Sequence, residues 1–299
     1  MRLAITGASG LIGEALSAAL RARGDEVIPV SRRARPGGIR WDPQQGFDPP
    51  DQLAGLDVVV NLAGESIAGR WTAAKKARIL DSRLASTRAV VEAFRAAGER
   101  RPRVLINASA TGIYGDRGDE LLDEHSAAGP EGEFLPEVTR AWEQAARAVE
   151  ALEQPAVRLC FARFGVVLAK QGGALAKMLL PFRLGAGGKI GSGQQWMPWV
   201  HIDDAVGALL HLIDSERARG AYNLVAPAPV RNAEFTAALG RALHRPTLLP
   251  VPKLGVKLAL GEMGEALLLD GQRAVPRRLE AEGFGFRYGQ LSAAFAELL

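Results

Sequence analysis

Apolar residues recur along the chain as short continuous runs separated by longer segments with helical spacing. The first thirty residues predict a strand at 3–6, a glycine-rich turn at 7–13, a helix at 11–23 and a strand at 27–30. A strand, a helix and a second strand in this order form a βαβ unit, whose two strands are parallel and whose crossover is right-handed. The pattern therefore predicts an α/β protein.

Further apolar runs at 58–62, 104–107 and 157–164 predict three more strands. In the segment after the first run, Leu80, Leu84, Thr87, Val91 and Phe94 are spaced three or four residues apart, which places them on one face of a helix. Continuous apolar strands are typical of a parallel sheet covered by helices on both faces. We therefore predict a Rossmann-type doubly wound parallel sheet.

Beyond residue 165 the chain becomes richer in glycine and proline, notably at 185–193 and 246–252. Such loops between short elements indicate a smaller C-terminal α/β lobe over the carboxyl ends of the strands, where open sheets bind ligands. We predict an NADP-binding Rossmann domain at 1–168, to which 199–225 return, and a substrate-binding lobe made of 169–198 and 226–299.

The composition is that of an ordinary globular protein, with 47% hydrophobic and 23% charged residues and a net charge of +4. The basic residues are scattered, so we expect no nucleic-acid partner. No apolar run reaches the length of a membrane span and no leader is visible, so we expect no membrane contact and a cytoplasmic location. The single cysteine, Cys160, excludes an internal disulfide, and the four histidines lack ligand spacing, so we expect no metal site.

The glycine-rich turn carries glycines at positions 7, 10 and 13, directly after a predicted strand and at the start of a predicted helix. Gly7 allows the tight turn, Gly10 allows a close approach of a pyrophosphate, and Gly13 allows the helix to pack on the strand. Ser9, Leu11 and Ile12 complete this loop. The sequence therefore predicts a dinucleotide site here.

The residue type at the end of the second strand separates the two nicotinamide cofactors, because an acidic side chain there binds a ribose hydroxyl whereas arginine accommodates a phosphate. This chain has Ser31, Arg32 and Arg33 and no acid. Ser31 and Arg32 can bind a 2′-phosphate through charge-assisted hydrogen bonds. We therefore predict NADP(H) as the cofactor, and Leu62, Ala63 and Gly64, after the third strand, as the next part of its groove.

These motifs resemble those of the extended short-chain dehydrogenase/reductase superfamily, as do Ser109 and the pair Tyr114 and Gly115. The chain is more closely similar to an atypical epimerase-like branch that is labelled nucleoside-diphosphate-sugar epimerase or cell division inhibitor. The matching segments extend over nearly the whole chain and lie at 61–65, 70–71, 82–83, 179–182, 190–193, 198–204 and 271–276.

The resemblance implies a small C-terminal lobe, NADP(H) binding, and cofactor contacts by Arg83 and Arg163 in addition to the residues above. From the sequence alone, Arg83 also fits an exposed helix position, and Arg163, within an apolar strand, needs a buried anionic partner or a wet strand end. Many relatives dimerise through the helices that correspond to 72–98 and to the segment starting near Phe134, so a homodimer is possible.

The resemblance also implies a catalytic serine, here Ser109, followed by a tyrosine and a lysine that exchange a proton with the substrate. At the expected positions the chain has Phe134 and Val138, and none of its three tyrosines is followed four residues later by lysine. An active enzyme then needs another acid or base. The candidates are Tyr114, our first choice, and Glu65, Glu143 and His201.

Two functions remain open from the sequence. The first is an NADP(H)-dependent oxidoreductase or epimerase of an unknown small molecule, with Ser109 and Tyr114 as catalytic residues. Phe182, Trp196 and Trp199 then either contact a partly apolar substrate or form the core of the lobe. The second is a non-catalytic NADP(H) sensor that acts through a protein partner, which the loss of both proton-carrying residues favours. A fold alone does not decide between these functions.

Overall fold

A computed structural model describes residues 1–33, 36–152 and 154–299. The N-terminal part contains β1 (Arg2–Thr6), α1 (Leu11–Ala22), β2 (Glu26–Ser31), β3 (Ile39–Asp42), β4 (Gly46–Phe47), β5 (Val58–Asn61), α2 (Ala73–Ala96), β6 (Val104–Ala110), β7 (Leu121–Leu122), α3 (Phe134–Arg147) and β8 (Arg158–Phe164). The C-terminal part contains β9 (Val166–Ala169), α4 (Gly173–Arg183), β10 (Trp196–Met197), β11 (Trp199–His201), α5 (Ile202–Asp214), β12 (Gly220–Leu224), β13 (Val230–Arg231), α6 (Asn232–Ala242), α7 (Lys253–Leu260), α8 (Glu262–Gly264), β14 (Arg273–Ala274), α9 (Arg277–Ala281) and α10 (Leu291–Leu298).

The central sheet has eight strands in the order β12-β8-β6-β5-β1-β2-β3-β4. All neighbouring strands are parallel except β3 and β4, which form an antiparallel extension at one edge. This arrangement confirms the predicted Rossmann-type sheet. The β3–β4 extension was not foreseen, because only Trp41 and Phe47 are buried there and two isolated apolar positions give no strand-like run.

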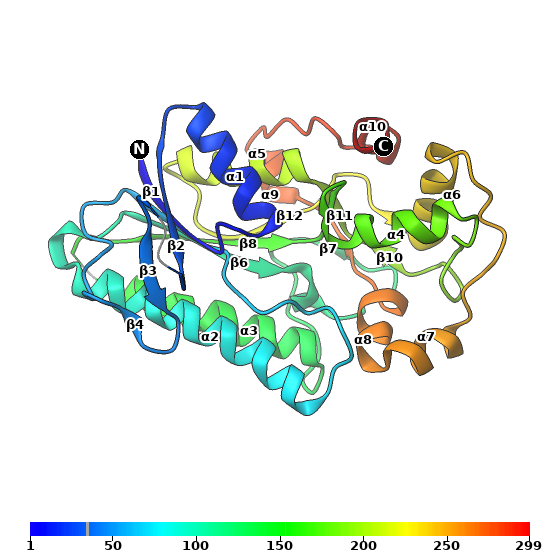
Figure 1. Cartoon of the computed structure of the whole chain (residues 1–299), viewed down its shortest axis with the longest axis horizontal. Helices are drawn as coiled ribbons and strands as arrows, with labels where there is room; N and C mark the ends of the chain where they lie inside the picture. Colours follow the sequence, from blue (N-terminus) through cyan, green and yellow to red (C-terminus); the bar gives the residue numbers. More distant parts are fainter. Residues whose placement is uncertain (34–35, 153) are drawn as a thin grey trace.

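Helices cover both faces of the sheet, with α1 and α5 on one side and α2 and α3 on the other (Figure 1). Alternate residues of each central strand enter the two cores: Ile106 and Cys160 face α1 and α5, whereas Leu105 and Phe161 face α2 and α3. Because side chains of a strand alternate between faces, Asn107 and Ser109 share the α2–α3 side with Leu105. No helix in the described part of the chain is both long and apolar enough to cross a bilayer.

The lobe lies beyond the carboxyl ends of the strands and contains α4, α6, α7 and α8 (Figure 1). Its own core joins α4 and α6 to α10 around Phe235 and Phe295. The segment after residue 270 also crosses back to the sheet, since Leu279, Phe284 and Phe286 pack against the core beneath α1 and α5. The C-terminal segment predicted as lobe, 226–299, therefore contacts both parts of the molecule.

Candidate cofactor groove and strand-end site

The glycine turn after β1 is tight because backbone occupies the space that side chains would need. Gly7 has φ +68°, and a Cβ on it would lie 2.9 Å from the carbonyl carbon of Leu62. A Cβ on Gly13 would lie 2.3 Å from the carbonyl oxygen of Gly7. Gly10 begins α1 without a side-chain cap, so the first amides of this helix remain available for an anion. Ser9 is exposed, and Leu11 and Ile12 are half-buried along the same loop.

Thr6, the last residue of β1, holds the backbone that follows the neighbouring strand β5. Its Oγ1 accepts hydrogen bonds from the backbone N–H groups of Leu62 and Ala63, both at 3.1 Å, and donates to Oδ1 of Asn61 at 2.6 Å. Thr6 and Asn61 are fully buried. The strand end at 62–64, which was predicted as part of the groove, is therefore held against the glycine turn.

The same polar network continues beneath the sheet to α2 and α3. The Asn61 amide donates to Oδ1 of Asn107 at 2.7 Å and to Oγ1 of Thr87 at 3.1 Å. The Trp142 indole N–H donates to the same Thr87 oxygen at 3.0 Å. Buried polar groups that are satisfied in this way fix the relative position of the elements that carry them. The sequence signal for this network was weak, because Asn61 and Asn107 each stand alone in an apolar strand.

Ser31, Arg32 and Arg33 lie at the end of β2, beside the glycine turn. The Ser31 hydroxyl donates to the Arg33 carbonyl at 2.5 Å, which leaves its lone pairs free to accept. Both arginines are exposed. The end of β2 thus presents two exposed arginines, and the charge of Arg32 contributes to the lowered pKa of the Glu65 carboxyl.

Arg83 lies on α2 and reaches back to the strand end after β5. One guanidinium nitrogen donates to the carbonyls of Glu65 and Ile79, both at 3.0 Å, and the guanidinium carbon lies 5.0 Å from the centre of the Trp142 ring. Burial lowers the pKa of Arg83 to about 10. Gly64 makes room for this side chain, because a Cβ there would be 3.4 Å from its Cγ. Arg83 is therefore packed against the strand end after β5 and is not an exposed helix charge.

Ser109, at the end of β6, belongs to a buried ionic cluster. Its hydroxyl donates to Oε1 of Glu143 at 2.6 Å. Arg163, the strand neighbour of Ser109 on β8, binds the same carboxylate through Nε at 2.8 Å and Nη2 at 3.0 Å. Although burial opposes its charge, the hydrogen bonds and charge of Glu143 raise the pKa of Arg163. Arg163 thus has the buried anionic partner that its place in an apolar strand requires.

Tyr114 completes this cluster from the turn after β6. Its hydroxyl accepts from Nη1 of Arg163 at 3.0 Å and donates to Oδ1 of Asn223 at 2.7 Å. The side chain is fully buried, and burial raises the pKa of its phenol. Both hydrogen-bonding directions of the hydroxyl are therefore occupied by the protein. Asn223 on β12 was missed by the sequence analysis, since nothing near it suggests a site.

Phe134 and Val138, which stand where the tyrosine and lysine were expected, lie in an apolar cluster. The Phe134 ring packs edge-on against Trp71 at 4.9 Å between centroids, and Val138 is buried with Trp71 and Ile79. Met263 of α8 reaches into the same cluster from the lobe. The place of the usual proton carriers is therefore filled by hydrophobic packing.

The two other acid or base candidates have partners in the structure. Glu65 binds Nζ of Lys75 at 2.7 Å, and this hydrogen bond, with the charge of Lys75, lowers the pKa of the carboxyl. His201 is fully buried, binds Glu297 at 2.9 Å, and accepts the backbone N–H of Asp203 at 3.1 Å as the cap of α5. His201 thus stabilises the start of a helix.

The aromatic residues of the lobe separate into two groups. Phe182 and Trp199 are buried in the lobe core, so of the two roles that the sequence left open, substrate contact or core, they have the core role. Trp196 is half-buried, with the guanidinium carbons of Arg231 and Arg273 4.4 and 4.8 Å from its ring centre. Its indole N–H donates to Asp119 at 2.8 Å. Of the three, Trp196 alone is accessible to a ligand.

A family model described as the NAD dependent epimerase/dehydratase family matches residues 3–224. The chain belongs to this family. A second model, a domain of unknown function, matches residues 251–298. The epimerase-like resemblance recognised from the motifs is thereby confirmed for the greater part of the chain.

Relatives in the family match along the full length. The epimerase family protein Mb2239 of Mycobacterium bovis is 43% identical over 98% of this chain and 95% of its own. The human epimerase family protein SDR39U1, whose crystal structure (isoform 2) was solved with NADPH, superposes with a TM-score of 0.90 at 37% identity, covering 100% of this chain and 99% of that one. MoeE5, solved with UDP-glucose and NAD, is 22% identical with a TM-score of 0.76 over 100% and 97% of the two chains, and shows the shared fold.

Proposed function

We propose that this protein binds NADP(H) in the groove formed by the glycine turn, the end of β2 and the strand end at 62–64. The observation that carries the proposal is the close approach of backbone at Gly7 and Gly13, next to the end of β2, where the chain has Ser31 and Arg32 in place of an acidic residue. The NADPH in the crystal structure of the human relative supports the same cofactor.

Within this groove, the glycine turn and the amides at the start of α1 would bind the pyrophosphate, with Ser9, Leu11 and Ile12 along it. Ser31 and Arg32 would bind the 2′-phosphate. Leu62, Ala63 and Gly64 would line the path toward the nicotinamide ribose, and Arg83 would supply further donors. Arg163, the remaining predicted contact, would approach the cofactor with its guanidinium already bound to Glu143 and Tyr114.

For the reaction, we propose an oxidoreductase or epimerase that acts on a small molecule without the tyrosine–lysine pair. NADP(H), when bound, supplies or accepts the hydride. The chain provides one hydroxyl backed by a carboxylate at the sheet edge, Ser109 with Glu143. Because the Glu143 carboxylate accepts hydrogen bonds from both Ser109 and Arg163, this pair would accept a proton from a substrate hydroxyl, while the buried Tyr114 would position Arg163.

A non-catalytic NADP(H) sensor is the second candidate, and two observations favour it. Ser109 is only 3% exposed, and the cluster around Phe134 and Val138 joins α3 to α8 of the lobe through Met263. This direct packing offers a route by which an occupied groove would alter the surface of the lobe for a partner.

The first experiment is a titration of the purified protein with NADPH and NADH, followed by nicotinamide fluorescence. We expect tighter binding of NADPH, and a loss of about tenfold or more of that affinity in Arg32→Ala, since charge-assisted hydrogen bonds are lost. Arg88→Ala, an exposed arginine on α2, is the matched control. Equal binding of the two nucleotides would contradict the assignment of Arg32.

The second experiment separates the two candidates. We would measure the rate of NADPH oxidation with a panel of carbonyl compounds and the rate of NADP⁺ reduction with the matching alcohols. Both rates are measured for the unaltered protein and for Glu143→Gln. Turnover that falls in the variant, while NADPH affinity is unchanged, supports the oxidoreductase. If the protein binds NADPH but turns over none of the panel, and proteolysis near α8 slows on binding, the sensor is supported.

A further inference from the structure

The outer part of the lobe carries an unusual separation of charge. Residues 154–202 and 235–261 contain no aspartate or glutamate. Within these segments, the stretches 177–189 and 241–253 carry six exposed lysines and arginines, and none of the six forms an ion pair in the described part of the chain. They are Lys177, Arg183, Lys189, Arg241, Arg245 and Lys253.

The two segments adjoin in space although they are far apart in the sequence. The Arg245 guanidinium donates to the Arg183 carbonyl at 2.9 Å, and the Val251 N–H donates to the Lys189 carbonyl at 2.9 Å. Gly188 and Leu248 form a bridge between them. The segments belong to α4, the end of α6 and α7, at the lobe end of the molecule (Figure 1). The two segments therefore bring the six basic residues to one end of the molecule, where Glu265 and Asp270 are the carboxyl groups whose charge interacts with Lys253.

Six leucines with 64–84% of their surface exposed project from the same segments. They are Leu180, Leu184, Leu248, Leu249, Leu254 and Leu258. The only other large hydrophobic residues exposed in the described ranges are Met1, Leu121 and Val251, and Val251 lies among these leucines. Such a concentration marks an interaction surface. We call the six leucines and six basic residues the basic leucine face.

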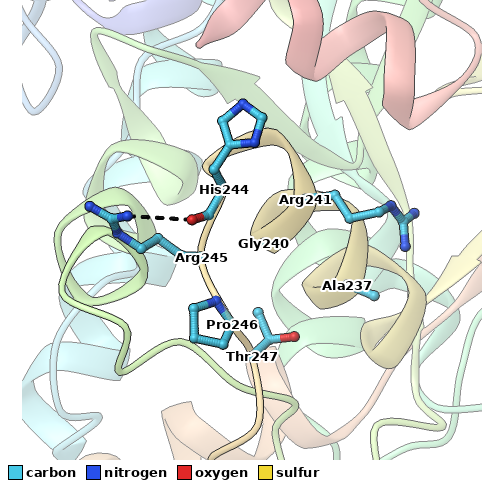
Figure 2. A pocket seen from close by; sticks show the side chains of 7 residues that line it. All are labelled: Ala237, Gly240, Arg241, His244, Arg245, Pro246 and Thr247. Carbon is cyan, nitrogen blue, oxygen red and sulfur yellow. Dashed lines mark hydrogen bonds between the residues drawn. The ribbon is translucent and has the colours of Figure 1, made fainter.

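The turn after α6 shows how the charge is distributed (Figure 2). A pocket of about 480 Å³ lies at this turn, with Arg241 and Arg245 extending from it on opposite sides and His244 between them. Their guanidinium groups do not converge on a point, as they would to bind one small anion. This spacing suits a surface that carries many anionic groups.

We propose that the basic leucine face binds the surface of a membrane that contains anionic phospholipids. The leucines would enter the boundary between headgroups and acyl chains while the lysines and arginines bind headgroup phosphates. A second copy of this chain fits less well, because like charges would face each other. An acidic protein fits less well because the leucines are spread over α4 and its end, the segment after α6, and α7, and none of them lines the pocket at the turn after α6. The proposal departs from the expectation of no membrane contact, which considered only segments able to span a bilayer.

The test is flotation of the full chain with vesicles of phosphatidylcholine alone and with phosphatidylglycerol added at about one part in four. We expect binding only with phosphatidylglycerol, weakening as salt is raised because the attraction is screened. Leu254→Asn/Leu258→Asn should reduce binding by about tenfold or more, and Arg241→Glu/Lys253→Glu by a similar factor. Leu121→Asn and Arg88→Glu change an exposed leucine and arginine elsewhere and should leave binding unchanged.

The folding of each variant is checked by its thermal midpoint and by NADPH titration. A loss of vesicle binding is interpreted only for variants that are folded. No flotation of the unaltered protein at low salt, or equal flotation of the face and control variants, would overturn the proposal. So would a concentration-dependent dimer that the leucine variants dissociate, without vesicle binding, since that assigns the face to a second copy. Binding to polyglutamate but to no vesicle would point to an acidic protein.

Discussion

The guanidinium of Arg163 binds the carboxylate of Glu143 through two hydrogen bonds, and a third connects Glu143 to Ser109. Both charged side chains are almost fully buried, with 9% and 6% of their surface exposed. A buried charge that loses its partner is left uncompensated in a region of low dielectric constant. The pair therefore fixes how β6, β8 and α3 meet at the carboxyl edge of the sheet.

Removal of the carboxylate in Glu143→Ala should lower the free energy of unfolding by about 3–5 kcal/mol, because Arg163 stays buried without its counter-ion. Urea denaturation followed by circular dichroism measures this change. Glu92→Ala, which removes an exposed carboxylate that pairs with Arg95, should cost less than about 1 kcal/mol. Similar costs for the two variants would show that the cluster around Arg163 contributes little to stability.

The glycine turn allows a second comparison. In Gly13→Ala the new methyl group would meet the Gly7 carbonyl oxygen, so α1 must shift away from β1. We expect a destabilisation of about 1–3 kcal/mol and a loss of NADPH binding by fluorescence titration. Gly255→Ala, in α7 with no atom within 4 Å of the new Cβ, should be neutral or stabilising by up to about 1 kcal/mol. Normal NADPH binding by Gly13→Ala would contradict the groove assignment.

The main elements could be predicted because their patterns are local. The strands at β1, β5, β6 and β8 are continuous apolar runs, and the helix from Phe134 begins at the residue the resemblance indicated. The glycine turn was also visible, because its residues are consecutive. The β3–β4 extension lacked such a signal.

The buried cluster around Arg163 could not be assembled from the sequence, because its members come from five separate segments. These are β6, the turn after β6, α3, β8 and β12. From the sequence, Glu143 was one of several candidate acids and Asn223 was not a candidate. The sheet order places β12 next to β8, and β8 next to β6, which brings their ends together. The burial of Tyr114 was equally hidden, because its position in the turn after β6 does not show that Arg163 and Asn223 bind its hydroxyl. Partners distant in the chain, rather than local pattern, decided these roles.

The lone cysteine provides a test of core burial. Cys160 is fully buried, its thiol donates to the Ala218 carbonyl at 3.1 Å, and burial raises its pKa to about 11. Since the thiolate is the reactive form, Cys160 should not react with a disulfide reagent at pH 8 in the folded protein and should react fully in urea. Glu99→Cys, which adds an exposed thiol, should give one rapid equivalent. Rapid labelling of the unaltered protein would show that β8 opens readily.

Asp270 lies in the lobe directly before Gly271, and its carboxyl is in an unfavourable setting for a negative charge. Burial, followed by the charges of Asp116, Glu265 and Glu133, raises its pKa from 3.8 to about 6. Between pH 3.8 and about 6, the Asp270 carboxyl therefore holds its proton more tightly in the folded protein than in the unfolded chain. Stability from this group is therefore present at low pH and is lost as the pH rises from about 4 to about 6.

Asp270→Asn removes the charge and should stabilise the protein at pH 7 by about 1 kcal/mol, after allowance for solvent screening. The gain should vanish near pH 4, where the aspartate is protonated in both states, and urea denaturation at the two pH values measures it. Asp119→Asn is the opposite control: hydrogen bonds from Trp196 and Arg231 lower the pKa of Asp119, so its removal should destabilise the protein at pH 7. If Asp270→Asn were equally stabilising at both pH values, the gain would come from packing or a new hydrogen bond rather than from the titration of Asp270.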